Sequence, residues 1–227
     1  AVGISHDGNN TMYIAYEDGY HNSNANPSNI PRYKLYKVQG TTTTDITNVP
    51  ILSQALEWRH ITNIVVDPAN PNVVYVATGG FAPLGGTSCD AFQKVLKSTD
   101  GGQSWTDIST GLLAVPINDM VYQEGTNGIL FVATDAGVYR YDPQVGQWEC
   151  FNRDFTVSVV TKLQIDPCLG KIYASTFGKG LWMADLPEAT TQGAGEVTIS
   201  QNESWSGSRL MGSDIRITNG AQLTLSG

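Results

Sequence analysis

The sequence predicts an all-β protein and, within that class, a β-propeller. The composition is the first observation, because 24 glycines and only 15% charged residues suit short strands joined by many tight turns. The second observation is a pattern of apolar strand, polar turn and second apolar strand that occurs four times along the chain. The third is the unit length of about 40–50 residues with room for four antiparallel strands, which is typical of a propeller blade.

One aromatic residue occupies the same place in each repeat and aligns the four units. Small residues follow it, a combination that suits a close-packed inner strand. A third strand with alternating side chains comes next. A fourth, outer strand is expected in three units. The aligned aromatics are Tyr13, Tyr75, Phe131 and Tyr173. The third strands are expected at 33–37, 94–98, 137–141 and 180–184, and the fourth near 45–47, 105–108 and 147–151.

These alignments predict blades at about 1–56, 57–115, 116–156 and 157–187. The last blade has only three strands, so we expect a strand from the N-terminal region to close its free edge. Four blades lie at the low end for a propeller, and further blades or a partner chain are expected to complete the ring.

The composition and the strand pattern of the sequence change after the last blade. Residues 188–195 read as a linker, because they are small and polar and include two glycines. Short alternating strands with glycine turns follow at 196–227. They predict the start of a second β module, either a β-solenoid or a β-sandwich.

The segment from Ser98 to Trp105 predicts the turn between the third and fourth strands of the second blade. The carboxylate of Asp100 can accept backbone N–H groups within the turn. Gly102 permits left-handed backbone. Trp105 then begins the outer strand and can pack between sheets.

This turn resembles the Asp-box (BNR) repeat of sialidases, sortilin-type receptors and xyloglucanases. The segment 67–80 strengthens the resemblance to the sortilin/xyloglucanase type, and a degenerate box surrounds Asp142, Gly146 and Trp148. The resemblance covers residues 1–187. The strands at 196–227 add a resemblance to the modules that follow propellers in secreted, multidomain Bacteroidetes surface proteins, which implies a secreted or cell-surface location and the type IX secretion route. The resemblance of the repeats specifies the fold far better than the function, because unrelated activities share these repeats.

Two insertions, at 20–29 and 81–90, separate the second and third strands of their blades and are therefore expected on one face. Insertions gathered on one face often form a binding surface, although loops also grow without function. Tyr20, His21 and Phe81 are the candidate ligand-binding residues. We therefore expect a non-catalytic binding or scaffold propeller that recognises a protein or a glycan.

A glycoside hydrolase of the xyloglucanase type is the alternative function. Such an enzyme needs two carboxylates across the sugar. Asp119 and Asp135 are the candidates, because turns do not explain them as they explain the other aspartates. A sortilin-like receptor that holds a peptide inside the ring is a third hypothesis.

The charge and the motifs of the sequence limit the classes of partner that we expect. The net charge of −8 and the lack of a basic run disfavour nucleic acid. No apolar run is long enough for membrane insertion. The spacing of His and Cys predicts no metal site or cofactor, although the turn at 7–10 has oxygen ligands that suit Ca²⁺.

Three cysteines, Cys89, Cys150 and Cys168, leave at least one thiol unpaired within the chain. Two arrangements stay open at the level of the sequence. The thiols are isolated, or Cys150 and Cys168 form a disulfide between neighbouring blades.

Overall fold

A computed structural model describes residues 2–4, 11–17, 33–80, 93–152, 157–187, 197–199, 202–206, 215–217 and 222–226. The chain forms two compact units. The first comprises Ala1–Glu124 and Gly128–Leu186, and the second comprises Gly125–Asn127 and Pro187–Gly227. Each unit is described by itself below.

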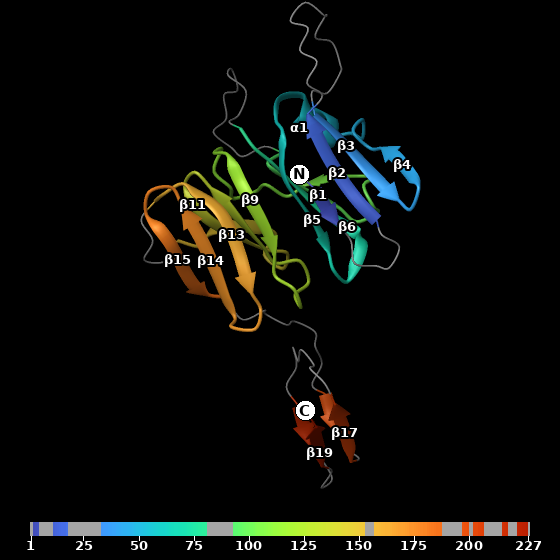
Figure 1. Cartoon of the computed structure of the whole chain (residues 1–227), viewed down its shortest axis with the longest axis vertical. Helices are drawn as coiled ribbons and strands as arrows, with labels where there is room; N and C mark the ends of the chain where they lie inside the picture. Colours follow the sequence, from blue (N-terminus) through green and yellow to red (C-terminus); the bar gives the residue numbers. More distant parts are fainter. Residues whose placement is uncertain are drawn as a thin grey trace, which may run out of the picture. The chain divides into compact units, whose positions relative to one another are not determined.

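Four antiparallel sheets follow one another along the first unit (Figure 1). The first sheet contains β1 (Val2–Ile4), β2 (Thr11–Glu17), β3 (Tyr33–Gln39) and β4 (Thr42–Asp45). The second contains β5 (Ile61–Asp67), β6 (Asn70–Thr78), β7 (Val95–Ser98) and β8 (Thr106–Asp107). The third contains β9 (Ile117–Tyr122), β10 (Leu130–Thr134), β11 (Gly137–Asp142) and β12 (Gln147–Cys150). The fourth contains β13 (Val160–Asp166), β14 (Lys171–Thr176) and β15 (Gly180–Asp185).

The strands of every sheet are ordered in space as they are in the sequence, and the sheets meet through their first strands. β1 contacts β5, β5 contacts β9, and β9 contacts β13. Consecutive meanders that share a central row of first strands are the arrangement of propeller blades. The predicted β-propeller fold is therefore confirmed, and we call the four sheets blades 1 to 4.

The aligned aromatic residues lie on the second strand of each blade, as the repeat alignment predicted. Tyr13, Tyr75 and Phe131 are 0–1% exposed. Each points toward the following blade, where it joins an apolar cluster between two sheets. The core of the first unit is thus divided into three layers, one for each pair of neighbouring blades.

A short helix, α1 (Leu52–Trp58), joins blades 1 and 2 and was not predicted. Leu52, Ala55 and Leu56 are buried against the core between these blades. Their i, i+3, i+4 spacing is a helical signal that was present in the sequence.

Blade 4 has three strands in the described part of the chain, as predicted. The expected closing strand is not found among the described N-terminal residues. The first described strand, β1, pairs with β2 in blade 1 instead. The outer edge of β15 therefore carries no partner strand within the described residues.

The second unit pairs its strands in parallel. β16 (Val197–Ile199) pairs with β18 (Ile215–Ile217), and β17 (Glu203–Ser206) pairs with β19 (Leu223–Ser226). Each pair joins segments about one repeat of 18–20 residues apart, Val197 with Ile215 and Glu203 with Leu223. Parallel stacking of successive turns favours a β-solenoid over an antiparallel sandwich.

Candidate functional site

The first strands of blades 2, 3 and 4 contain the same irregularity. In β5 the register passes from Ile61–Thr78 to Asn63–Ala77, which leaves Thr62 without a cross-strand partner. Asn118 in β9 and Thr161 in β13 are skipped in the same way. A bulge of this kind bends the strand and redirects the side chain that follows it.

The residues that follow the three bulges are Asn63, Asp119 and Lys162, and they contact one another across the blades. Asn63 Nδ2 and Lys162 Nζ both donate to Asp119 Oδ1, the lysine at 3.1 Å. The backbone N–H of Leu163 donates to Asp119 Oδ2 at 2.8 Å. We call these three residues the inter-blade polar layer.

Asp119 is only 2% exposed, whereas the side chain of Lys162 is 72% exposed. Buried carboxylates are tolerated when they are paired and hydrogen-bonded. Both oxygens of Asp119 are occupied by neighbouring blades. The structure therefore gives this sequence-predicted catalytic candidate the contacts of a residue that holds three blades together.

Asp135, the second candidate carboxylate, lies in the turn between β10 and β11 and is half-buried. Its Oδ1 accepts a hydrogen bond from Asn118 Nδ2 at 2.9 Å, and Asn118 also donates to Val160 O at 2.8 Å. The bulged residue thus ties the turn to blade 4. Asp135 lies at the end of blade 3 that corresponds to the two insertions, since all three connect second and third strands.

A buried pair of cations that the sequence analysis did not single out lies at the same end of blade 2. Lys94 is fully buried and its Nζ donates to Gly80 O. Burial lowers the pKa of Lys94 to about 8, and the nearby charge of Arg59 acts in the same direction. Burial likewise lowers the pKa of Arg59, whose guanidinium donates to Gln93 O at 3.3 Å.

These contacts anchor both ends of the segment that joins β6 to β7, because Gly80 and Gln93 flank it. Thr78 Oγ1 adds a hydrogen bond to Gln93 O at 3.1 Å. Gln93 itself has a φ of 54°, the left-handed region that non-glycine residues seldom occupy. The base of the second insertion is therefore held in one conformation. No single-sequence pattern indicates that Lys94 is buried.

The first strands also line an open groove. Its walls come from β5, β9 and β13, and it holds an empty volume of about 860 Å³ that includes open solvent. Most of its lining is apolar or turn residues, among them Val65, Met120 and Tyr122, with Glu124 as the acidic member. The groove runs along the central row of strands, where a ring would have its channel.

The turn from Ser98 to Trp105 is closed by Asp100. Its Oδ1 accepts the backbone N–H groups of Gln103 and Ser104, each at 2.9 Å, and its Oδ2 accepts the hydroxyl of Ser104. The hydrogen bond from the Ser104 hydroxyl contributes most to lowering the pKa of Asp100 to about 2. Ser98 Oγ accepts the N–H of Gly102 at 2.8 Å. This carboxylate is therefore committed to the turn.

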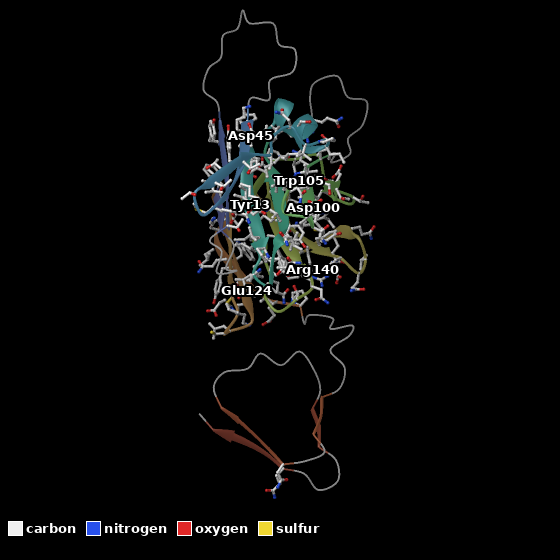
Figure 2. The ribbon with its side chains drawn as sticks, turned by 90° about the vertical axis from the view of Figure 1, so that its right-hand side faces the viewer. Tyr13, Asp45, Asp100, Trp105, Glu124 and Arg140 are labelled. Atoms are coloured by element: carbon white, nitrogen blue, oxygen red, sulfur yellow. The ribbon has the colours of Figure 1, made fainter. Side chains whose placement is uncertain are left out.

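Gly102 and Trp105 connect this turn to blade 1. Gly102 has a φ of 91°, and a Cβ at this position would lie 2.6 Å from Ile46 Cδ1. Trp105 is 5% exposed and belongs to the apolar cluster between blades 1 and 2, together with Tyr13. Figure 2 shows Asp100, Trp105 and Tyr13 in the same region of the first unit.

Several predicted site residues lie outside the described residues. They are the ligand-binding candidates Tyr20, His21 and Phe81 and the turn at 7–10 that was considered for Ca²⁺. Within the described ranges, no cluster of His, Cys, Asp and Glu could hold a metal ion. No helix in those ranges is both long and apolar enough to span a membrane.

Cys150 and Cys168 are both exposed free thiols, so the disulfide considered between them is absent from the structure. Cys150 ends β12, the outermost strand of blade 3. Cys168 lies in the turn after β13, the innermost strand of blade 4. The strand positions place the two thiols at different depths of their blades.

Comparisons with known proteins identify the fold. No family model and no curated protein matches the chain. Among solved structures, the chain is similar to the GH74 enzyme of Niastella koreensis, with a TM-score of 0.56 and 15% identity over 84% of this chain and 29% of that one. It is also similar to the GH74 xyloglucanase of Xanthomonas campestris, with a TM-score of 0.53 and 14% identity over 83% of this chain and 29% of that one.

A third similar structure is the extracellular domain of BT4673 from B. thetaiotaomicron, with a TM-score of 0.52 and 16% identity over 83% of this chain and 21% of that one. The chain thus spans less than a third of each of these three structures. At such identities the likeness establishes a common fold, and fold alone does not specify activity.

Proposed function

We propose that this chain is part of a non-catalytic binding or scaffold propeller, which recognises a protein or a glycan through the loops at one end of its blades. The observation that carries the proposal is that Asp119 is buried and that neighbouring blades occupy both of its carboxylate oxygens. A glycosidase needs a carboxylic acid and a second carboxylate that both reach the sugar. Asp119 is buried, ion-paired to Lys162 and bonded to the backbone of Leu163.

The anchoring of the second insertion supports the choice of face. Lys94 and Arg59 hold the residues that flank the segment 81–92, and Asn118 holds the turn that contains Asp135. Binding residues are often carried on loops that a rigid scaffold positions. Tyr20, His21 and Phe81 belong to the two long segments at this end and are the proposed contacts.

We further infer an extracellular or cell-surface location and an Asp-box role for Ser98, Asp100, Gly102 and Trp105. The hydrogen bonds of Asp100 within its turn and the position of Trp105 between blades support that role. Fold likeness to the extracellular domain of BT4673 supports the location. The type IX secretion route stays a proposal that rests on resemblance alone.

A glycoside hydrolase of the xyloglucanase type is the second candidate. Fold likeness to two GH74 enzymes and the half-buried Asp135 near the loop end favour it. A peptide receptor is the third candidate, and the groove along the first strands supports that one.

Binding of the full chain to arrays of glycans and of surface proteins tests the leading proposal. We expect at least one saturable ligand whose affinity falls at least about tenfold in the variants Tyr20→Ala and Phe81→Ala. Val145→Ala is the matched control, because Val145 is 63% exposed in the β11–β12 turn at the opposite end of blade 3.

Two outcomes would contradict the proposal. A ligand whose affinity is unchanged in both loop variants but falls in Val145→Ala would move the binding surface away from the loops. Release of reducing ends from xyloglucan by the wild-type chain would favour the hydrolase instead.

A further inference from the structure

The outer strands of blades 1, 2 and 3 end in one recurring pattern. The apolar residue after each strand donates its backbone N–H to a carbonyl of the third strand. The side-chain oxygen of the next residue accepts the backbone N–H of that same third-strand residue. The donors are Ile46 to Leu35 O at 3.0 Å, Ile108 to Val95 O at 3.0 Å and Phe151 to Val138 O at 2.8 Å. The side-chain acceptors are Thr47 for Leu35 N at 3.0 Å, Ser109 for Val95 N at 3.0 Å and Asn152 for Val138 N at 2.7 Å.

In blades 2 and 3 a tryptophan precedes this apolar residue by three positions. Trp105 and Trp148 are 5% and 3% exposed, and each belongs to the apolar cluster shared with the preceding blade. Trp148 Nε1 donates to Ile108 O at 2.7 Å. The indole therefore fills the space between two blades, against the apolar residue that ends the outer strand of the blade before it.

Blade 4 lacks this strand within the described residues, and the strand that would receive it is exposed. β15 corresponds to β11, because Leu181 pairs with Ser175 of β14 as Val138 pairs with Ala133 of β10. Leu181 and Met183 are 69% and 58% exposed. Within the described residues the edge of β15 has no partner strand, and an open edge invites pairing with another strand.

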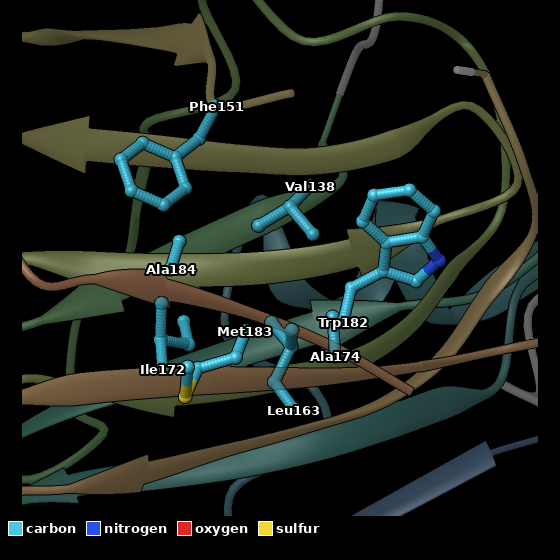
Figure 3. A pocket seen from close by; sticks show the side chains of 8 residues that line it. All are labelled: Val138, Phe151, Leu163, Ile172, Ala174, Trp182, Met183 and Ala184. Carbon is cyan, nitrogen blue, oxygen red and sulfur yellow. The ribbon is translucent and has the colours of Figure 1, made fainter. Parts of the chain in front are cut away.

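An apolar pocket lies where a tryptophan of blade 4 would lie. One wall is formed by Val138 and Phe151 of blade 3, which correspond to Val95 and Ile108 in the cluster around Trp148. Blade 4 supplies most of the remaining lining, and Figure 3 shows the eight side chains around the pocket. The lining residues from blade 4 are Leu163, Ile172, Ala174, Trp182, Met183 and Ala184.

The register identifies the residue that an incoming tryptophan would face. Trp148 pairs with Tyr141 of β11, and the ring centroids are 5.3 Å apart. The position of Tyr141 corresponds to Ala184 in β15, since Met183 pairs with Tyr173 as Arg140 pairs with Phe131. Alanine at this position leaves room that tyrosine fills in blade 3.

We infer that the edge of β15 and this pocket bind an extended segment of sequence Trp-x-x-(Ile/Phe)-(Ser/Asn), the pattern of the outer strands of blades 2 and 3. The segment pairs antiparallel with β15. Its tryptophan lies opposite Ala184, inside the pocket, as Trp148 lies opposite Tyr141. Its apolar residue lies beside Leu181. The side-chain oxygen of the last residue in the segment accepts a hydrogen bond from the backbone N–H of Leu181. Strand addition of this kind takes affinity from the backbone and specificity from the pocket. The surface is separate from the loop end that carries the proposed ligand site.

A synthetic peptide that copies residues 101–110 supplies the pattern from this molecule, with Trp105, Ile108 and Ser109. Isothermal titration of the full 227-residue chain with this peptide tests the inference. We expect saturable binding with a Kd on the order of micromolar, and a loss of at least about tenfold when the peptide's tryptophan is replaced by alanine.

Two variants of the chain locate the site. Ala184→Glu places a charge in the pocket and is expected to abolish binding, whereas Val145→Glu adds the same charge to an exposed turn and is expected to leave the Kd unchanged. Thermal melts establish that both variants are folded. Equal binding by the Ala184→Glu variant, or equal affinity for the alanine peptide, would overturn the inference. A dimer of the chain that Ala184→Glu dissociates and the peptide does not would also overturn it, because the occupant would then be a second copy.

Discussion

Single polar residues carry much of the contact between blades. Asp119 receives hydrogen bonds from blade 2 through Asn63 and from blade 4 through Lys162 and Leu163. A buried carboxylate without hydrogen-bond partners costs free energy. The partners of Asp119 therefore stabilise the packing of the three blades chiefly by supplying those hydrogen bonds. At this scale, burial separates a carboxylate that holds blades together from one that could act on a substrate.

We expect Asp119→Ala to lower the free energy of unfolding by about 1–3 kcal/mol, because the N–H of Leu163 loses its acceptor inside the protein. Lys162→Ala should cost less, roughly 0–1 kcal/mol, since the lysine is largely exposed. Urea titrations of both single variants and of the double variant measure these values. An Asp119→Ala chain as stable as the wild type would contradict the role given to this residue.

The ionisation of Lys94 gives a stability change with a defined sign. Burial lowers its pKa from 10.5 to about 8 in the folded chain. Between these values the unfolded chain binds more protons than the folded chain, so the stability of the folded state rises with pH. Asp135 opposes this shift and Arg59 adds to it.

Urea titrations at increasing pH, with Lys94→Met as the reference, isolate the contribution of Lys94 from that of the other groups that titrate in this range. From about pH 7 to about pH 10 the wild type should gain on the order of 1–3 kcal/mol relative to the variant. A difference that stays constant over this range would show that the lysine titrates alike in both states.

The outer strands occur in blades 1, 2 and 3, but the residues that they insert between the sheets differ. The outer strands of blades 2 and 3 both insert a tryptophan between sheets, whereas blade 1 has a threonine, Thr43, at the corresponding position. Gly111 lets the backbone of β12 approach closely, because a Cβ on this glycine would lie 2.4 Å from the backbone oxygen of Trp148. The fourth strand therefore contributes to the core through one large side chain as well as through its ladder.

Trp148→Ala should cost about 3–5 kcal/mol, the range for removing a large buried aromatic. Trp148→Phe keeps most of the apolar area but loses the hydrogen bond to Ile108 O, and should cost roughly 1–2 kcal/mol. Thermal or urea unfolding of both variants ranks these contributions. Equal losses in the two variants would show that the hydrogen bond, rather than the packing, determines the effect.

The sequence allowed the blades and most of their strands to be predicted, because apolar alternation and the aligned aromatics reflect packing between sheets. The helix at Leu52–Trp58 was missed although Leu52, Ala55 and Leu56 have helical spacing. The bulges at Thr62, Asn118 and Thr161 were beyond prediction, since they arise from pairing between strands.

The candidate site was harder to predict than the fold. Asp119 stood out in the sequence only because turn chemistry did not explain it, and its partners come from blades 56 and 43 residues away along the chain. Lys94 gave no signal, because burial of a lysine depends on neighbours that a single sequence does not identify. The bridge considered between Cys150 and Cys168 is absent: both thiols are free, one on the outermost strand of blade 3 and one beside the innermost strand of blade 4.

At the scale of the whole molecule, the first unit is a row of four blades and the described part of the second is built from parallel pairs. Each blade uses one face for the blade before it and the other for the blade after it, so both ends of the row present surfaces built for a neighbour. In the proposed function, the loops at one end of the blades bind the ligand, and the inter-blade polar layer holds the blades together.

Hydrolysis of xyloglucan, measured as reducing ends released, tests most directly whether the carboxylates of blade 3 hold blades or cleave sugars. The wild-type chain, Asp119→Asn and Asp135→Asn are compared, with thermal unfolding recorded for each. We expect no release above background from any of the three and a lower melting temperature for Asp119→Asn. Cleavage by the wild type that Asp119→Asn abolishes without a change in melting temperature would contradict this reading and make the chain a hydrolase.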